Sequence, residues 1–112
     1  YLAAKLTCRK AAESIDSAME KHRLDAIIAP TDGPAGMIDY VHGDRGSNSC
    51  SSPAAVAGYP HVTVPAGALG GLPIGLSFFG RAWSEEALIR LAYAFEQSGS
   101  WRPDPKFARS GA

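Results

Sequence analysis

The sequence has no excess of charge of either sign, because eleven lysines and arginines balance eleven aspartates and glutamates over 112 residues. Without a basic patch we expect no nucleic acid partner, and without an acidic tract we expect no cationic macromolecular partner. No apolar run approaches the roughly 20 residues that a membrane-spanning helix needs. We therefore expect no membrane partner.

Cysteine is scarce, since the chain contains only Cys8 and Cys50. Their separation matches no metal-ligand pattern, and two isolated thiols favour a reducing compartment over a disulfide framework. We expect two free thiols and a cytoplasmic protein. A disulfide between these cysteines stays open as the alternative.

Compact catalytic motifs are also missing. The sequence has no G-x-S-x-G nucleophile elbow, no P-loop and no G-x-G-x-x-G. Asp39, His42 and Asp44 form a D-x-x-H-x-D cluster whose oxygen and nitrogen atoms could hold a divalent metal. Because that spacing matches no strong motif, we interpret the cluster as ordinary loop polarity and expect neither a metal nor a cofactor.

What the sequence does contain is a strand–turn–strand signal. His61–Pro65 and Ile74–Gly80 alternate apolar and other residues and are rich in β-branched and aromatic side chains. The glycines of Ala66–Pro73 allow a chain reversal, so we predict an antiparallel pair with a connection longer than two residues. Ala26–Ala29, stopped by Pro30, fits a third, buried strand.

Two amphipathic helices flank these runs. The first, Tyr1–Leu24, carries one apolar stripe on an otherwise charged helix. The second follows Ser84, its expected N-cap, and a shorter helix is expected to begin at Ser52, its cap, and to end at Gly58. The stripe of the second long helix repeats at i, i+3, i+4 and i+7 and consists of Leu88, Leu91, Ala92 and Phe95.

The remaining segment, Thr31–Ser51, is rich in glycine and aspartate and has no apolar periodicity. We predict a long loop, and such loops in small domains usually have a function or an external anchor. The predicted fold class is α/β, with a small mixed sheet that includes an antiparallel strand pair and is covered by two amphipathic helices. Residues 1–112 are expected to form a single domain.

Four segments together resemble the closing portion of amidase-signature hydrolases. They follow the order and spacing of that family and cover nearly the whole chain; each is weak alone, and jointly they are specific. They are LDAIIAPT (Leu24–Thr31), PAAVAGYPHVTVPAG (Pro53–Gly67), GLPIGLSFFGRAWSEEALIRLAYAFEQ (Gly71–Gln97) and an Arg-Pro-x-Pro-x-Phe tail (Arg102–Phe107). The chain is most similar to bacterial amidases related to the glutamine-hydrolysing component of glutamyl-tRNA(Gln) amidotransferase.

The resemblance implies amide hydrolysis by a Ser–cis-Ser–Lys triad within a mixed sheet wrapped by helices. In the family these groups lie in the first half, around a Gly/Ser-rich stretch that this sequence lacks, so no catalytic residue can be carried over. Lys5, Lys10 and Lys21 are expected on the exposed side of a helix. We therefore expect a C-terminal fragment that is inactive alone, whose partners are the rest of the amidase domain and a small-molecule amide substrate.

The resemblance also implies one substrate contact in the long loop. In the glutamine-using branch, an acidic residue just before the Pro-x-x-x-Ala-Gly helix holds the amino group of the substrate, and the matching position here is Asn48. Asparagine has no charge to pair with an ammonium, which argues against a free amino acid substrate. We expect Asn48, Ser49 and Cys50 to line the mouth of the substrate pocket, with plain loop as the alternative.

Two other functional interpretations stay open. One is a non-catalytic binding or assembly module that reuses this part of the amidase fold. The other is a hydrolase that acts through a Ser/His/Asp set. A chain of this length buries a small share of its surface and leaves sheet edges open, so we also expect self-association or marginal stability in isolation.

Overall fold

The computed structural model describes residues 1–43, 49–102 and 104. Its elements, in chain order, are α1 (Leu2–His22), β1 (Ile27–Pro30), α2 (Ser51–Ala57), β2 (His61–Leu69), β3 (Leu72–Phe79) and α3 (Glu85–Gln97). The predicted long loop follows β1, as expected. Within this part of the chain, no helix is both long enough and apolar enough to cross a bilayer.

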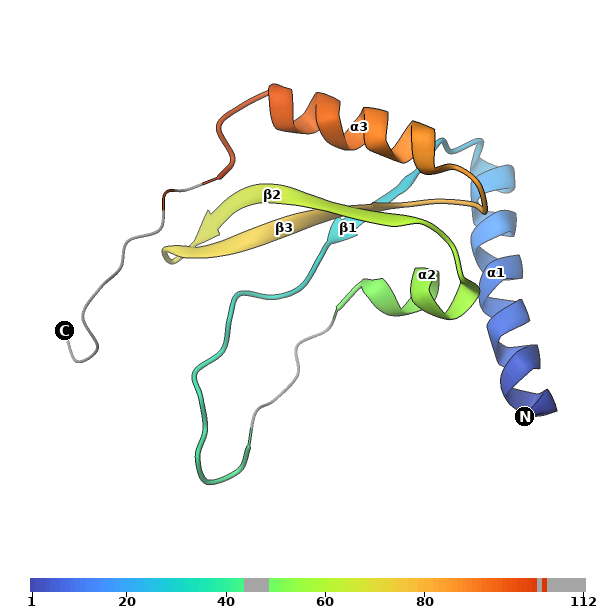
Figure 1. Cartoon of the computed structure of the whole chain (residues 1–112), viewed down its shortest axis with the longest axis horizontal. Helices are drawn as coiled ribbons and strands as arrows, with labels where there is room; N and C mark the ends of the chain where they lie inside the picture. The colour runs from blue at the N-terminus through green and yellow to red at the C-terminus, as the bar shows by residue number, and fades with distance from the viewer. Residues whose placement is uncertain (44–48, 103, 105–112) are drawn as a thin grey trace.

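The three strands form one sheet in the order β1-β3-β2. Helix α3 lies along one side of this sheet and α2 on the other, while α1 stands at one end (Figure 1). The predicted α/β class and the antiparallel pair are confirmed, and of the two predicted amphipathic helices α3 covers the sheet whereas α1 packs on α2. Both pairings are antiparallel, so the parallel pairing of a mixed sheet is not found among these three strands.

The β2–β3 hairpin is tighter than the sequence predicted. Pairing continues to Leu69 and Leu72, and only Gly70 and Gly71 connect the strands. Both glycines have a positive φ, 60° and 84°, as a two-residue hairpin turn that follows the twist of the strands requires. The expected longer connection is therefore wrong. The irregular part of the strand pair is instead a shift of register between Pro65 and Ala68.

Strand β1 occupies the predicted position but is not buried. It pairs with β3 alone among the described strands, and α3 packs on β2 and β3. The side chain of Ile28, which lies opposite Phe78, is exposed for this reason. The prediction of a strand covered on both faces is therefore wrong for the described part of the chain.

The apolar core lies between α3 and the hairpin. Its buried members are Val64, Phe78, Leu88 and Ala92. Phe95 is half-buried and meets Phe78 edge-on, with ring centroids 6.1 Å apart, whereas Leu91 is exposed. Three of the four predicted stripe residues of α3, Leu88, Ala92 and Phe95, thus pack on the hairpin. Leu91 lies at the margin of this contact.

Helix α1 uses only its second half to pack. Ile15 and Met19 are buried, but Leu2 and Leu6 are 76% and 58% exposed. The predicted helix is confirmed, while its apolar stripe continues beyond the sheet toward the N-terminus with no described residue burying it (Figure 1). The three lysines of this helix, Lys5, Lys10 and Lys21, are exposed as expected.

The helix ends differ in detail from the predicted caps. Helix α2 has Cys50, not Ser52, at its N-cap, and the Ser51 N–H donates to Ser49 Oγ at 3.2 Å. Ser84 is the N-cap residue of α3, but its hydroxyl donates to the Arg81 carbonyl at 2.7 Å instead of capping the helix. Gly58 ends α2 in the left-handed conformation, as predicted.

The described residues expose more apolar side chains than they bury. Eight apolar residues are buried, against seventeen large apolar side chains that are exposed. The radius of gyration is 17.0 Å, compared with about 13 Å for a compact domain of about 100 residues. The core of the described residues therefore buries only a minority of their large apolar side chains.

Two hydrogen bonds join α1 to the residues just before β2 and just after β3. The Tyr59 hydroxyl donates to Asp16 Oδ2 at 2.8 Å, and Arg81 Nη2 donates to the Asp16 carbonyl at 3.2 Å. The bond to Asp16 raises the pKa of Tyr59 above its usual value near 10, because a phenolate would lose this donor and repel the carboxylate. This contribution to stability is complete below pH 10 and is lost as the pH rises through the pKa of the folded state.

Replacing Tyr59 by phenylalanine tests this tie. We expect Tyr59→Phe to lower the free energy of unfolding by about 0.5–1 kcal/mol at pH 7, the usual net value of one such bond. The wild-type chain should lose more stability than Tyr59→Phe between pH 9 and pH 11. Urea unfolding at each pH measures both effects, and parallel pH profiles for the two proteins would contradict the assignment.

Candidate functional site

The two ends of the long loop meet at Thr31, the residue after β1. The Cys50 N–H donates to the Thr31 carbonyl at 3.1 Å, and Ser49 Oγ donates to the same oxygen at 3.3 Å. The Thr31 N–H in turn donates to the Gly75 carbonyl of β3 at 2.9 Å. These bonds fix Ser49 and Cys50 against the end of the sheet, directly before α2.

A buried hydroxyl group supports this junction. Ser77 on β3 has no exposed surface, and its Oγ lies 2.8 Å from Thr31 Oγ1 and 3.1 Å from Thr63 Oγ1. Gly75 allows the approach, because a Cβ atom there would lie 2.8 Å from Thr31 Oγ1 and 2.9 Å from Thr63 Cγ2. The alternating pattern of Ile74–Gly80 puts Ser77 on the face opposite the apolar side chains, and the sequence assigns it no role. The role of Ser77 becomes visible only from the strand register, which pairs Ser77 with Thr63.

The predicted pocket-mouth residues are described in part. Ser49 is exposed, and its Oγ lies 2.9 Å from Ser51 Oγ. Cys50 is half-buried, and both it and Cys8 are free thiols. Asn48 lies outside the described residues. The structure therefore brings Ser49 and Cys50 together at the base of the loop.

The partners of the described serine hydroxyls are other hydroxyls, backbone groups and the Trp101 indole. Ser49 bonds Ser51 and Thr31, and Ser77 bonds two threonines. No hydrogen bond joins a serine hydroxyl to a lysine or histidine side chain within the described ranges. A serine nucleophile needs such a base, so the described geometry contains no activated serine.

Asp39 organises the middle of the long loop. Its Oδ1 accepts the backbone N–H groups of Val41 at 2.9 Å and His42 at 3.0 Å, and its Oδ2 lies 3.1 Å from His42 Nδ1. The N–H groups of His42 and Val41 lower the pKa of Asp39, which keeps the carboxylate ionised. Asp44 lies outside the described residues, and those that are described contain no group of three or more potential metal ligands.

The residues around this turn form what we call the apolar tip, Met37–Val41. Met37, Tyr40 and Val41 are 96%, 92% and 84% exposed. Together with Gly36 and Gly43 they line an open hollow of about 570 Å³. In Figure 1 this loop extends away from the sheet on the side opposite α3.

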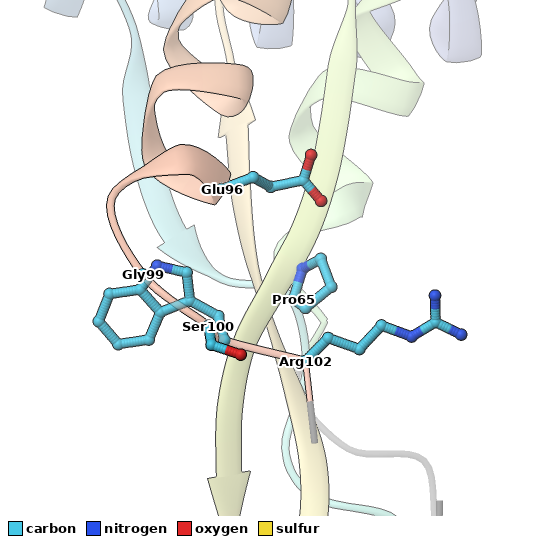
Figure 2. A pocket seen from close by; sticks show the side chains of 6 residues that line it. Pro65, Glu96, Gly99, Ser100 and Arg102 are labelled. Atoms are coloured by element: carbon cyan, nitrogen blue, oxygen red, sulfur yellow. The ribbon is translucent and has the colours of Figure 1, made fainter. Parts of the chain in front are cut away.

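A second hollow lies where the C-terminal end of α3 faces β2. It measures about 370 Å³ and is lined by Pro65, Glu96, Gly99, Ser100, Trp101 and Arg102. Figure 2 shows Glu96 and Arg102 on either side of Pro65, extending past the same edge of β2. Trp101 closes one side, since its ring stacks on Phe95 with centroids 5.2 Å apart and its Nε1 donates to the Phe95 carbonyl.

The sheet and its helices share their fold with solved structures of amidases. Residues 1–89 match the sequence profile described as Amidase, and the chain belongs to this family. The match covers more than half of the chain, and the resemblance carried by its sequence segments is confirmed.

Relatives and solved structures agree with this assignment. The structure is similar to that of the peptide amidase of Stenotrophomonas maltophilia, with a TM-score of 0.83 and 46% identity over 97% of this chain and 22% of that one. A putative amidase of Arthroderma benhamiae is 41% identical over 97 residues, 80% of this chain and 15% of that protein. A probable amidase of Arabidopsis thaliana is 40% identical over 94 residues, 83% of this chain and 15% of that protein. The chain thus spans about a fifth or less of the length of these relatives.

Removing the Ser77 hydroxyl tests the support of the loop base. We expect Ser77→Ala to lower the free energy of unfolding by about 1–3 kcal/mol, because the Thr31 and Thr63 hydroxyls lose a buried partner. The matched control is Ser14→Ala, which removes an exposed hydroxyl that bonds only its own helix and should cost less than about 0.5 kcal/mol. Equal urea unfolding curves for the two variants would show that the Ser77 hydroxyl does not hold the junction.

Proposed function

We propose that this chain is the C-terminal structural portion of an amidase, which completes the sheet and one wall of the substrate pocket. The complete enzyme hydrolyses a carboxylic amide, adding water across the C–N bond to give a carboxylate and ammonium. The Ser–cis-Ser–Lys groups belong to the rest of the enzyme. The observation that supports this proposal most directly is the close similarity to a peptide amidase, of which this chain covers only 22%.

The exposed apolar surfaces support an unfinished scaffold. The first turns of α1 present Leu2 and Leu6 beside a hollow of about 630 Å³. Strands β1 and β2 each have one free edge in the described sheet. Apolar helix faces and open edges of this kind need a cover in a stable enzyme, and the rest of the amidase domain supplies it.

The loop base supports a role in the pocket wall. Ser49 and Cys50 are held in place by Thr31, and Asn48 is their direct neighbour in the sequence. A neutral asparagine suits a substrate whose nearby part carries no ammonium. Because the similar enzyme is named a peptide amidase, we infer a peptide amide as the substrate.

The thiols support the compartment that the sequence predicted. Cys8 and Cys50 are free, and Cys8 is exposed. Exposed thiols of this kind persist where glutathione and thioredoxin keep cysteines reduced. We therefore place the enzyme in the cytoplasm.

A chimera tests the proposed function. Residues 1–112 would replace the corresponding C-terminal segment of the S. maltophilia peptide amidase, and ammonia release from a peptide amide would be measured. We expect turnover by the chimera, and none by the 112-residue chain alone or by the peptide amidase truncated before this segment. Turnover by the chain alone would contradict the proposal. A folded but inactive chimera would favour the non-catalytic binding module instead.

Asn48→Ala in the active chimera tests the pocket wall. We expect the KM for the peptide amide to rise about two- to tenfold, the cost of one neutral hydrogen bond, with kcat nearly unchanged. Gln97→Ala, which removes an exposed amide from α3, is the matched control. An unchanged KM and substrate preference in Asn48→Ala would remove Asn48 from the wall and leave the scaffold role intact.

A further inference from the structure

The apolar tip is an ordered turn that displays large apolar side chains to solvent. Asp39 accepts two backbone N–H groups, and the Gly43 N–H donates to the Asp39 carbonyl at 3.0 Å. These bonds close the turn, while Met37 and Tyr40 remain almost fully exposed. Contiguous exposed apolar side chains on an ordered segment mark a contact surface.

The same turn carries a fixed negative charge. The Asp39 carboxylate is partly exposed and is held ionised by backbone donors. Its Oδ2 also lies 3.1 Å from His42 Nδ1, and residues 31–43 contain no lysine or arginine. The surface therefore combines apolar area with an anion, which suits a ligand that has an apolar side chain and a cationic end.

We propose that the apolar tip binds an apolar side chain and the amino-terminal ammonium of a peptide amide substrate. This inference rests on the proposed function and adds a subsite to it. A peptide amide has the required chemistry, because it keeps its amino-terminal ammonium while its carboxyl end is neutral. Its charge is thus complementary to that of the tip.

The reach of the loop fits this role. Met37 follows Thr31 by six residues, so the tip lies at most about 20 Å along the chain from the loop base. An extended peptide covers that distance in about six residues. A substrate whose amide end lies near Ser49 and Cys50 can therefore present its upstream residues to the tip.

The charge also favours a substrate over permanent protein packing. An interface that buried the tip would bury the Asp39 carboxylate, and a buried charge needs a paired cation. The N-terminal face of α1 is different, since its apolar residues Leu2 and Leu6 alternate with Lys5 and Arg9, which can keep their charges in solvent. We therefore assign α1 to contact with the rest of the enzyme and the tip to the substrate.

Steady-state kinetics of the active chimera tests the subsite. Two peptide amides of about six residues would be compared, one with leucine and one with glycine near the amino terminus. We expect Tyr40→Ser to raise the KM for the leucine substrate about tenfold and to leave the glycine substrate and kcat nearly unchanged. The control Tyr93→Ser removes a 62% exposed tyrosine from α3, on the opposite side of the sheet, and should change neither KM.

Asp39→Asn tests the charge while keeping an oxygen that can accept the backbone N–H groups. The ratio of kcat/KM for a free-amine peptide amide to that for its N-acetylated form should fall about two- to fivefold. An unchanged ratio would contradict the ammonium contact.

Other outcomes identify other occupants. If Tyr40→Ser lowers the melting temperature of the chimera and impairs both substrates equally, the tip packs against the enzyme and the inference is wrong. If an active chimera shows no change with Tyr40→Ser, the inference alone is wrong. An unsubstituted chimera without activity would contradict the proposed function on which the inference depends.

Discussion

The buried hydroxyl of Ser77 is the contact on which the arrangement of the long loop depends. Ser77 links Thr31, where the loop leaves the sheet, to Thr63 on β2. Buried hydroxyls in folded proteins are normally hydrogen-bonded, and the Ser77 hydroxyl has two partners, the hydroxyls of Thr31 and Thr63. The Thr31 carbonyl also accepts hydrogen bonds from Ser49 and Cys50. Thr31 therefore holds the start and the end of the loop together.

The chain thus consists of a packed scaffold and an exposed loop that is fixed to it at Thr31. The hairpin, β1 and α3 form the scaffold, whose small core lies around Phe78 and Leu88. The loop that leaves this scaffold carries apolar side chains and an ionised aspartate into solvent. The first half of α1 is exposed in the same way. A chain that spans about a fifth or less of its relatives leaves such surfaces for other parts of the larger protein.

Much of the fold could be predicted from the sequence, because period-2 and helical patterns are strong in β3, α1 and α3. The patterns state which face is apolar but not what covers it, so β1 was wrongly predicted to be buried, and the exposure of the N-terminal half of α1 was not predicted. The chain reversal was located within Ala66–Pro73, but its two-residue length at Gly70 and Gly71 was not predicted, because Gly67 suggested a longer connection. The pairing of Ser77 with Thr31 was not predictable, since it joins residues 46 apart through the register of the sheet. The resemblance drew attention to Ser49 and Cys50, and the structure adds the bonds that hold them.

Hydrogen–deuterium exchange tests the central claim, that this chain is a scaffold completed by the rest of an amidase. The amides of residues 6–12 in α1 and of residues 75–79 in β3 would be followed in the dilute 112-residue chain and in the chimera. The account predicts that the α1 amides exchange rapidly in the chain alone and slowly in the chimera, while the β3 amides are protected in both. Equal protection of the α1 amides in the two proteins would contradict it.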